Sequence, residues 1–185
     1  MICITKACYW KAGISSLENI FSDGLFSWEV LMFLFHKKSM IYSPCNGTFK
    51  PLSEVKDEVF SKELMGKGFA VIPDTGDIHS PVDGKVTMVF PTKHAIGITD
   101  KNKIEYILHI GIDTVQLKGA GFEVCVQEGD SVKAGDLLVN CDLAMLKQAG
   151  YQTDVLVIIT NHKDVRIKQA DNLKVKEEIA YCENI

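Results

Sequence analysis

The sequence predicts an all-β protein, an antiparallel β-sandwich with only one or two short helices. Two observations predict it: short apolar runs that recur along the chain, and a turn motif that occurs twice. The runs are rich in β-branched and aromatic residues, are separated by Gly, Pro, Asn and Asp, and recur about every ten residues. Only residues 143–149, LAMLKQA, have the composition of a helix, and they are few.

The expected strands follow one another along most of the chain. They are residues 48–52, 68–73, 84–90, 94–99, 104–112, 122–126, 136–142 and 154–160. Residues 1–31 differ, because they are rich in Cys, Trp, Ser and Ile and show no sustained period. We therefore expect one folded domain over residues 32–185. Residues 1–31 are expected to be a poorly structured N-terminal extension or a mis-assigned start.

The turn motif Ser-Pro-x-[Asn/Asp]-Gly occurs at residues 43–47, SPCNG, and again at residues 80–84, SPVDG. Proline fixes φ for a turn, and Asn-Gly or Asp-Gly supplies the positive φ that a tight hairpin requires. A third turn unit, EGDSVKAGDLL at residues 128–138, places Gly-Asp pairs around Val132. Repeated corners indicate a duplicated motif whose two halves close into a curved sandwich.

The composition excludes several classes of function. A net charge of −4 argues against a nucleic-acid-binding protein, and the lysines are interleaved with acidic residues rather than gathered into a membrane-binding patch. The six cysteines form no CxxC pair, which is typical of reduced cysteines in a cytosolic protein. Residues 25–35, LFSWEVLMFLF, are too few to span a bilayer and show no signal-peptide pattern. We therefore expect a cytoplasmic protein.

Two of the five histidines are candidates for chemistry. His109 stands in the almost wholly apolar run YILHIGIDTVQLKG, and His94 begins the preceding expected strand. A hairpin that turns at residues 99–103, TDKNK, would place them on neighbouring strands. Such a pair could bind zinc, or one imidazole could carry a transferable group while the other hydrogen-bonds it. The alternative is a neutral core histidine satisfied by hydrogen bonds.

Other kinds of site lack their signatures. The sequence contains no G-x-S-x-G, no H-E-x-x-H and no P-loop. A zinc peptidase of similar architecture would commonly show a His-x-His pair, but Ile107 and Gly111 occupy the places two residues from His109. Residues 128–136 are similar to the turn of biotinyl and lipoyl carrier domains, yet the Met-Lys-Met or Asp-Lys-Ala setting of the modified lysine is absent.

The run LHIGIDTVQLKGAGF, residues 108–122, strongly resembles the phosphorylation-site motif of glucose-type enzyme IIA domains. These domains belong to the bacterial phosphoenolpyruvate-dependent sugar phosphotransferase system. The resemblance covers residues 40–182 and includes, in the family's order, SPCNGTFKPL, VFSKELMGKGFAVIP, SPVDGKV, FPTKHAIGI and VQEGDSVKAGDLLV. Lys103 and Tyr106 depart from it, since the family often has Gly and an aliphatic residue there. We expect a changed hairpin turn rather than a lost activity.

The resemblance implies an antiparallel β-sandwich, a barrel-sandwich hybrid of two related motifs. It also implies a phosphotransferase component that works as a phosphocarrier. His109 would accept a phosphoryl group on Nε2 from phospho-HPr and pass it to the IIB domain of a sugar permease, which drives coupled sugar uptake and phosphorylation. His94 would stabilise the phosphoryl group, and Thr92 would orient His94 through its hydroxyl. The protein would be peripheral to the membrane through the permease. When unphosphorylated, the same face could bind regulated enzymes or transporters.

The chemistry of a phosphohistidine predicts the surroundings of His109. A phosphorus–nitrogen bond hydrolyses readily, so the nucleophile should lie on a rigid strand in a shallow, largely apolar depression, with a backbone carbonyl to accept from Nδ1–H. The expected rim and partner-binding residues are Phe60, Leu64, Met65, Ile107, Ile110, Asp113 and Val115. No cofactor is obligatory. Two imidazoles make an incomplete tetrahedral site, so a zinc ion on His94 and His109 would need a partner's carboxylate.

Overall fold

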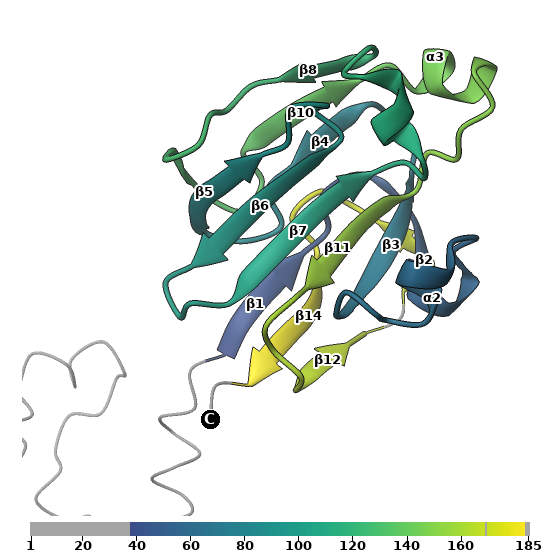
Figure 1. The fold of residues 1–185 in the computed structure, drawn as a ribbon. Helices are drawn as coiled ribbons and strands as arrows, with labels where there is room; N and C mark the ends of the chain where they lie inside the picture. Colours follow the sequence, from purple (N-terminus) through teal and green to yellow (C-terminus); the bar gives the residue numbers. More distant parts are fainter. Residues whose placement is uncertain (1–37, 169, 184–185) are drawn as a thin grey trace, which may run out of the picture. The chain divides into compact units, whose positions relative to one another are not determined.

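The computed structural model describes residues 38–168 and 170–183, and strands make up much of this part of the chain (Figure 1). The expected all-β sandwich is confirmed, and the helices are short. The expected extension over residues 1–31, the domain start at residue 32 and His36 lie outside the described residues. Among the residues that the structure describes, no helix has the length and hydropathy needed to cross a membrane.

The strands and helices have the following bounds. The strands are β1 (Lys38–Tyr42), β2 (Gly47–Pro51), β3 (Lys67–Pro73), β4 (Asp77–His79), β5 (Gly84–Val89), β6 (Ala95–Asp100), β7 (Glu105–Ile110), β8 (Phe122–Val124), β9 (Ser131–Val132), β10 (Leu137–Cys141), β11 (Val155–Ile159), β12 (Val165–Ile167), β13 (Asn172–Leu173) and β14 (Glu178–Glu183). The helices are η3 (Leu52–Glu54), α2 (Glu58–Ser61), η4 (Thr114–Leu117) and α3 (Leu143–Gln148).

The described strands form one large and two small sheets. The large sheet has eight strands in the order β13-β2-β3-β11-β7-β6-β5-β9, and the small sheets have the orders β1-β14-β12 and β4-β10-β8 (Figure 1). The main core includes Leu108 from the large sheet, Ile41 and Ile179 from one small sheet, and Leu138 from the other. The inner face of the large sheet therefore packs against both small sheets, which makes the sandwich.

Alternation along β7 sets the direction of His109. Leu108 and Ile110 are almost fully buried in the main core, while His109, between them, points to the outer face and is half-buried. The strand lies in the middle of the large sheet, where Ala95 on β6 and Leu156 on β11 are the register partners of His109. His109 therefore stands on a strand that is paired on both sides.

The helices η3 and α2 cover part of this outer face. A second group of buried residues, called here the outer cluster, comprises Leu52, Val55, Phe60, Ala70, Ile112, Leu156 and Ile158. The Asp57 side chain caps α2, because its Oδ1 accepts hydrogen bonds from the backbone N–H groups of Val59 at 2.8 Å and Phe60 at 3.1 Å. The cluster and the cap together hold α2 against β3 and β11, next to β7.

The repeated turn motif is duplicated in structure as well as in sequence. In both copies the serine hydroxyl donates at 2.7 Å to the backbone carbonyl two residues on, from Ser43 to Cys45 and from Ser80 to Val82. The copies also bond reciprocally, since the backbone N–H of Tyr42 donates to Pro81 and that of His79 donates to Pro44. These matched bonds agree with the expected pair of related halves.

The hairpin between β6 and β7 accommodates both departures from the family pattern. Lys103 has φ 66°, a left-handed conformation that glycine adopts more easily, which accounts for the glycine often found there. The Asp100 carboxylate accepts from the backbone N–H groups of Asn102 and Ile104, and the Tyr106 hydroxyl donates to it at 3.3 Å. The turn lies at the opposite end of the hairpin from the two candidate histidines.

Candidate functional site

The β6–β7 hairpin brings the two candidate histidines together. His94 directly precedes β6, whose first residue, Ala95, is the register partner of His109. The backbone N–H of Ile110 donates to the carbonyl of His94 at 2.8 Å. The two imidazole rings lie with centroids 4.9 Å apart and planes at 90°. His94 is buried, with 6% of its surface exposed, so His109 is the more accessible ring of the pair.

Thr92 lies where the sequence predicts it to act on His94. Its Oγ1 and the Nδ1 of His94 are 2.7 Å apart, a hydrogen bond between side chains two residues apart. Lys93, between them, has φ 58°, and this left-handed residue turns the chain. The bond engages Nδ1 of His94 and leaves Nε2 for another partner.

Two phenyl rings flank the imidazole pair. The ring centroid of Phe60, on α2, lies 4.9 Å from that of His109. The ring centroid of Phe90, the residue directly after β5, lies 5.6 Å from that of His94. The four rings therefore form a row in which each imidazole contacts one phenyl ring and the other imidazole. The sequence analysis did not name Phe90, although its place at the end of the run GKVTMVF, four residues before His94, was the available signal.

Both imidazoles favour the neutral form. Burial, followed by the neighbouring His94, lowers the pKa of His109 from 6.5 to about 4, although the Asp57 carboxylate and a hydrogen bond to the Gly111 backbone act in the opposite direction. Burial also lowers the pKa of His94. At pH 7 His109 therefore has an unprotonated ring nitrogen, as a nucleophile requires.

The chain turns sharply after His109. Gly111 has φ +75°, and a Cβ at this position would lie 2.4 Å from Cγ2 of Thr114 and 2.8 Å from the carbonyl oxygen of Gln152. The Gly111 N–H donates to the backbone carbonyl of Asp154 at 2.8 Å, which extends the pairing with β11 beyond the end of β7. A glycine here therefore allows the two backbone segments to approach closely.

Six of the seven predicted rim residues divide into three groups. Leu64, with 70% of its surface exposed, Met65 and Val115 are exposed apolar side chains. Asp113 is exposed in the loop before η4. Phe60 and Ile107 instead pack in or against the outer cluster, with Phe60 also in contact with His109.

Ile110 requires a correction. It is completely buried in the main core, because neighbouring residues on a strand point to opposite faces and His109 points outward. Ile110 therefore does not contribute to an exposed rim, and its assignment as a partner-binding residue is wrong. Two exposed apolar residues that the sequence analysis did not name are Val59 on α2 and Met88 on β5.

The described residues supply few ligands for a metal ion. Within residues 38–168 and 170–183, no group of three or more His, Cys, Asp or Glu side chains is arranged to hold one. His94 and His109 provide two imidazoles, and Nδ1 of His94 is already engaged by Thr92. A tetrahedral zinc site on this pair would require further ligands from outside these residues.

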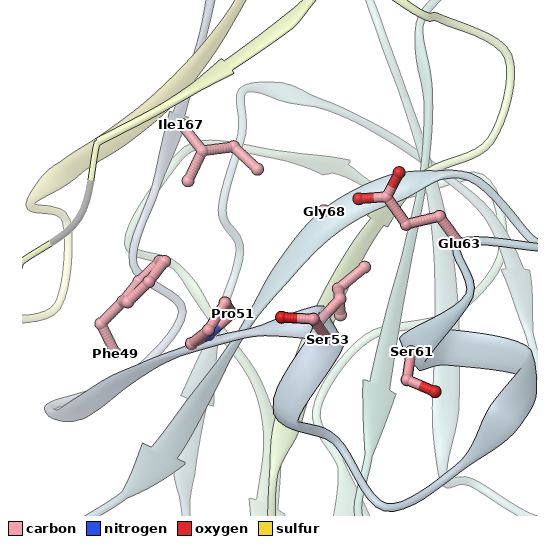
Figure 2. Close-up of a pocket in the computed structure, with 8 residues that line it drawn as sticks. Phe49, Pro51, Ser53, Ser61, Glu63, Gly68 and Ile167 are labelled. Carbon is pink, nitrogen blue, oxygen red and sulfur yellow. The ribbon is translucent and has the colours of Figure 1, made fainter.

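A pocket of about 180 Å³ lies beside α2 and is distinct from the histidine pair (Figure 2). It is lined by Phe49, Pro51, Leu52, Ser53, Ser61, Glu63, Gly68 and Ile167. Ser61 and Glu63 approach from one side and Phe49 and Ile167 from the other (Figure 2). None of the lining residues is a histidine. Since Phe60 packs on His109 and the next residue lines the pocket, α2 contributes to both.

Comparison with known proteins identifies similar chains. Residues 39–165 match the model of the family described as phosphoenolpyruvate-dependent sugar phosphotransferase system, EIIA 1. The chain is 52% identical over 124 residues, 67% of its length, to a PTS system beta-glucoside-specific EIIBCA component of Bacillus subtilis. It is 45% identical over 146 residues, 77% of its length, to a PTS system glucose-specific EIICBA component of Streptococcus pneumoniae. In both cases the match spans 20% of the relative's length.

A solved structure is also similar. The glucose permease IIA from Mycoplasma capricolum matches with a TM-score of 0.75 and 42% sequence identity. The match covers 80% of this chain and 97% of that one. The chain therefore corresponds to nearly the whole of a separate IIA protein, and to about a fifth of the multidomain relatives.

Proposed function

Because the chain belongs to the EIIA 1 family of the phosphoenolpyruvate-dependent sugar phosphotransferase system, we propose that His109 is the residue that carries the phosphoryl group. As a member of that family, the chain is a phosphotransferase component of sugar transport. The observation that carries the proposal for His109 is its geometry with His94. The imidazole of His109 is neutral and half-buried, and its ring centroid lies 4.9 Å from that of His94.

The first half-reaction transfers the phosphoryl group from a donor phosphohistidine to His109. The unprotonated nitrogen of His109, proposed to be Nε2, attacks phosphorus as the phosphorus–nitrogen bond of the donor breaks. The lowered pKa keeps this nitrogen unprotonated at pH 7. In this proposal the Gly111 backbone, whose hydrogen bonding acts on the pKa of the ring, holds the other ring nitrogen. The apolar contact with Phe60 helps to exclude water from one side of the bond formed.

His94 has a different role in the proposal. Thr92 engages its Nδ1, so Nε2–H is available to donate to a phosphoryl oxygen on the neighbouring ring. Such a preorganised donor stabilises negative charge as it develops during transfer. Burial of His94 favours its neutral form at rest, so a cationic ring is stabilised only when phosphoryl charge is present beside it.

We propose that phospho-HPr is the donor and the IIB domain of a sugar permease the acceptor. Relatives named as EIIBCA and EIICBA components support the second assignment, since their names join A and B parts in one chain. The protein would then act in the cytoplasm, peripheral to the membrane through the permease. These relatives are named as specific for different sugars, beta-glucosides and glucose. The proposal therefore covers sugars transported by this system and does not name one of them.

The exposed apolar residues near α2 and η4 provide the proposed partner-binding surface. It comprises Leu64, Met65 and Val115, and it adjoins the half-buried Ile107 and the buried Phe60, which contacts His109. Asp113, exposed in the loop that follows β7, would pair with a basic residue of the partner. The unphosphorylated protein would use the same surface to bind regulated enzymes or transporters. A zinc ion would bind His94 and His109 only where such a partner supplies a carboxylate.

The experiment combines phosphoenolpyruvate, enzyme I and HPr with the purified chain. We expect one phosphoryl label that is lost in acid and stable in base, and His109→Gln should abolish it. His162→Gln is the matched control, because His162 lies in a turn and its Nε2 is 3.0 Å from the Glu183 carbonyl oxygen. Full labelling of the His109 variant would overturn the assignment. Restored sugar uptake in a strain lacking its own IIA component would distinguish a transport role from a purely regulatory one.

A further inference from the structure

Lys50 and Asp154 form an ion pair that is shielded from solvent. Nζ of Lys50 lies 2.8 Å from Oδ2 of Asp154, and the two side chains are 16% and 7% exposed. The other ion pairs among the described residues, Lys62–Glu58 and Lys168–Glu178, are far more exposed. Exposed pairs contribute little to stability, whereas a shielded pair with one good hydrogen bond restrains both of its side chains.

The pair lies on the same face of the large sheet as His109. Lys50 on β2 is the register partner of Ala70 on β3, Ala70 is that of Leu156 on β11, and Leu156 is that of His109 on β7. Asp154 precedes Leu156 by two residues, so it points to this face as well. The small Ala70 side chain leaves room for Lys50 to reach across β3 to Asp154.

One end of the pair holds the turn that follows His109. The backbone carbonyl of Asp154 accepts the N–H of Gly111, two residues after His109, at 2.8 Å. The backbone carbonyl of Gln152 accepts the N–H of Ile112 at 3.1 Å. The segment that precedes β11 therefore holds the backbone of the turn that directly follows His109.

The other end holds the segment that carries Phe60. Lys50 is followed by Pro51, then by η3 and α2, and Phe60 on α2 contacts His109 with a centroid distance of 4.9 Å. The ion pair therefore links, across β3, the segment that carries Phe60 and the segment that bonds to the turn after His109. A shift of one segment would move Phe60 against the His109 ring, and a shift of the other would move the turn that follows His109.

We propose that Lys50 and Asp154 are positioning residues for phosphoryl transfer, which fix the orientation of His109 through Gly111 and the segment that carries Phe60. The inference rests on the proposed function of His109. Lys50 on β2 is separated from His109 on β7 by β3 and β11, so we expect the pair to act on the rate of transfer through geometry and not on the affinity for the phosphoryl donor. Misplacement of a reacting group by about 1 Å can cost about a hundredfold in rate, so the smaller shift expected here predicts a loss of about tenfold.

The test measures single-turnover transfer from phospho-HPr at a temperature well below the melting temperature of every variant. We expect Lys50→Met to lower the maximal rate about tenfold with an unchanged half-saturating HPr concentration, and Lys50→Arg to restore it to within about twofold. Nitrogen-15 NMR of the His109 ring should show a second tautomer in Lys50→Met and in Asp154→Asn. Lys168→Met is the control, because it removes an exposed lysine that also pairs with a glutamate.

Each alternative gives a distinct result. A lower melting temperature with normal transfer and an unchanged His109 ring would reduce the pair to a structural one and overturn the inference. A changed half-saturating concentration with a normal maximal rate would make Lys50 a docking residue, which also overturns it. If the single variants do not fold, the double variant Lys50→Met/Asp154→Leu leaves no unpaired charge and gives the same test. Absence of label on the wild type would contradict the proposed function. The NMR spectra of the His109 ring would still show whether the ion pair fixes the ring orientation.

Discussion

The imidazole of His109 meets that of His94 edge to face, with planes at 90° and centroids 4.9 Å apart. Protonation of one ring therefore raises the free energy of protonating the other, in addition to the cost of burial. Both effects favour a resting site with two neutral rings. A phosphoryl group on His109 would reverse this balance for His94, because its negative charge would stabilise the cationic ring.

The first prediction concerns the titration of His109. Its carbon-13 chemical shift at Cε1 should change with a midpoint near pH 4 rather than near 6.5. The proton-accepting nitrogen should thus stay free throughout the physiological range. A midpoint above about 6 would show that the ring is well solvated, which contradicts the burial that lowers its pKa.

The same shift predicts how stability depends on pH. The unfolded chain takes up a proton on His109 near pH 6.5, whereas the folded chain takes it up near pH 4, so the free energy of unfolding falls as pH falls between these values. The expected loss from this group is about 3 kcal/mol, complete below pH 4 and absent above pH 6.5. Urea unfolding of wild type and His109→Gln isolates it, because the variant lacks the titrating ring. Parallel pH curves for the two proteins would count against a buried neutral His109.

The second prediction tests the hydrogen bond between Thr92 and His94. Thr92→Val keeps the shape of the side chain but removes the hydroxyl that lies 2.7 Å from Nδ1. We expect transfer to slow about fivefold, the equivalent of about 1 kcal/mol for one lost hydrogen bond, and nitrogen-15 NMR to show mixed tautomers of His94. Thr48→Val, an exposed threonine on β2, should change neither. Unaltered His94 tautomers in Thr92→Val would remove Thr92 from the site.

The third prediction concerns the glycine after the candidate nucleophile. Gly111→Ala should destabilise the protein by about 3 kcal/mol, because the new Cβ would lie 2.4 Å from Cγ2 of Thr114 in addition to the strain of φ +75°. Gly150→Ala is the matched control, since Gly150 has φ +88° and open space around the added Cβ. It should cost about 1 kcal/mol, the backbone strain alone. The free energy of unfolding of both variants is measured with urea. Equal losses of stability would mean that the structure adjusts to the close contact at Gly111 without a further loss.

The sequence contains enough information to predict the strands that lie within apolar runs of five or more residues. Eight expected runs correspond to β2, β3, β5, β6, β7, β8, β10 and β11. The short strands β4, β9, β12 and β13 have two or three residues, too few to show a period of two. The pairing of β1 with β14 joins residues about 140 positions apart and follows from no local pattern. The α2 helix was also missed, although Asp57 followed by Glu58 is a helix-start signal.

The histidine pair follows from hairpin geometry, but its other contacts do not. The spacing of His94 and His109 around a short turn predicts neighbouring strands, and the structure places them so. Side chains alternate between the two faces along β7, which puts Ile110 on the inner face and His109 on the outer face. The predicted rim wrongly combined residues from both faces. Lys50 and Asp154 are visible as charges in or beside apolar runs. Their pairing depends on the strand order β2-β3-β11, which only the tertiary structure supplies.

The last prediction separates the roles of the two histidines. His94→Gln should still accept a phosphoryl group from phospho-HPr, because glutamine keeps a hydrogen-bond donor beside His109. Glutamine cannot become cationic, so onward transfer to the IIB domain should fall much further, by roughly 10²–10³ if one preorganised donor is a fair guide. The contact of Phe90 with the side chain at this position should persist, which limits the change to the lost charge. Rapid-quench measurements of both half-reactions on this one variant provide the test. Equal losses in both halves would assign His94 to general positioning, and no loss in either half would exclude it from the site.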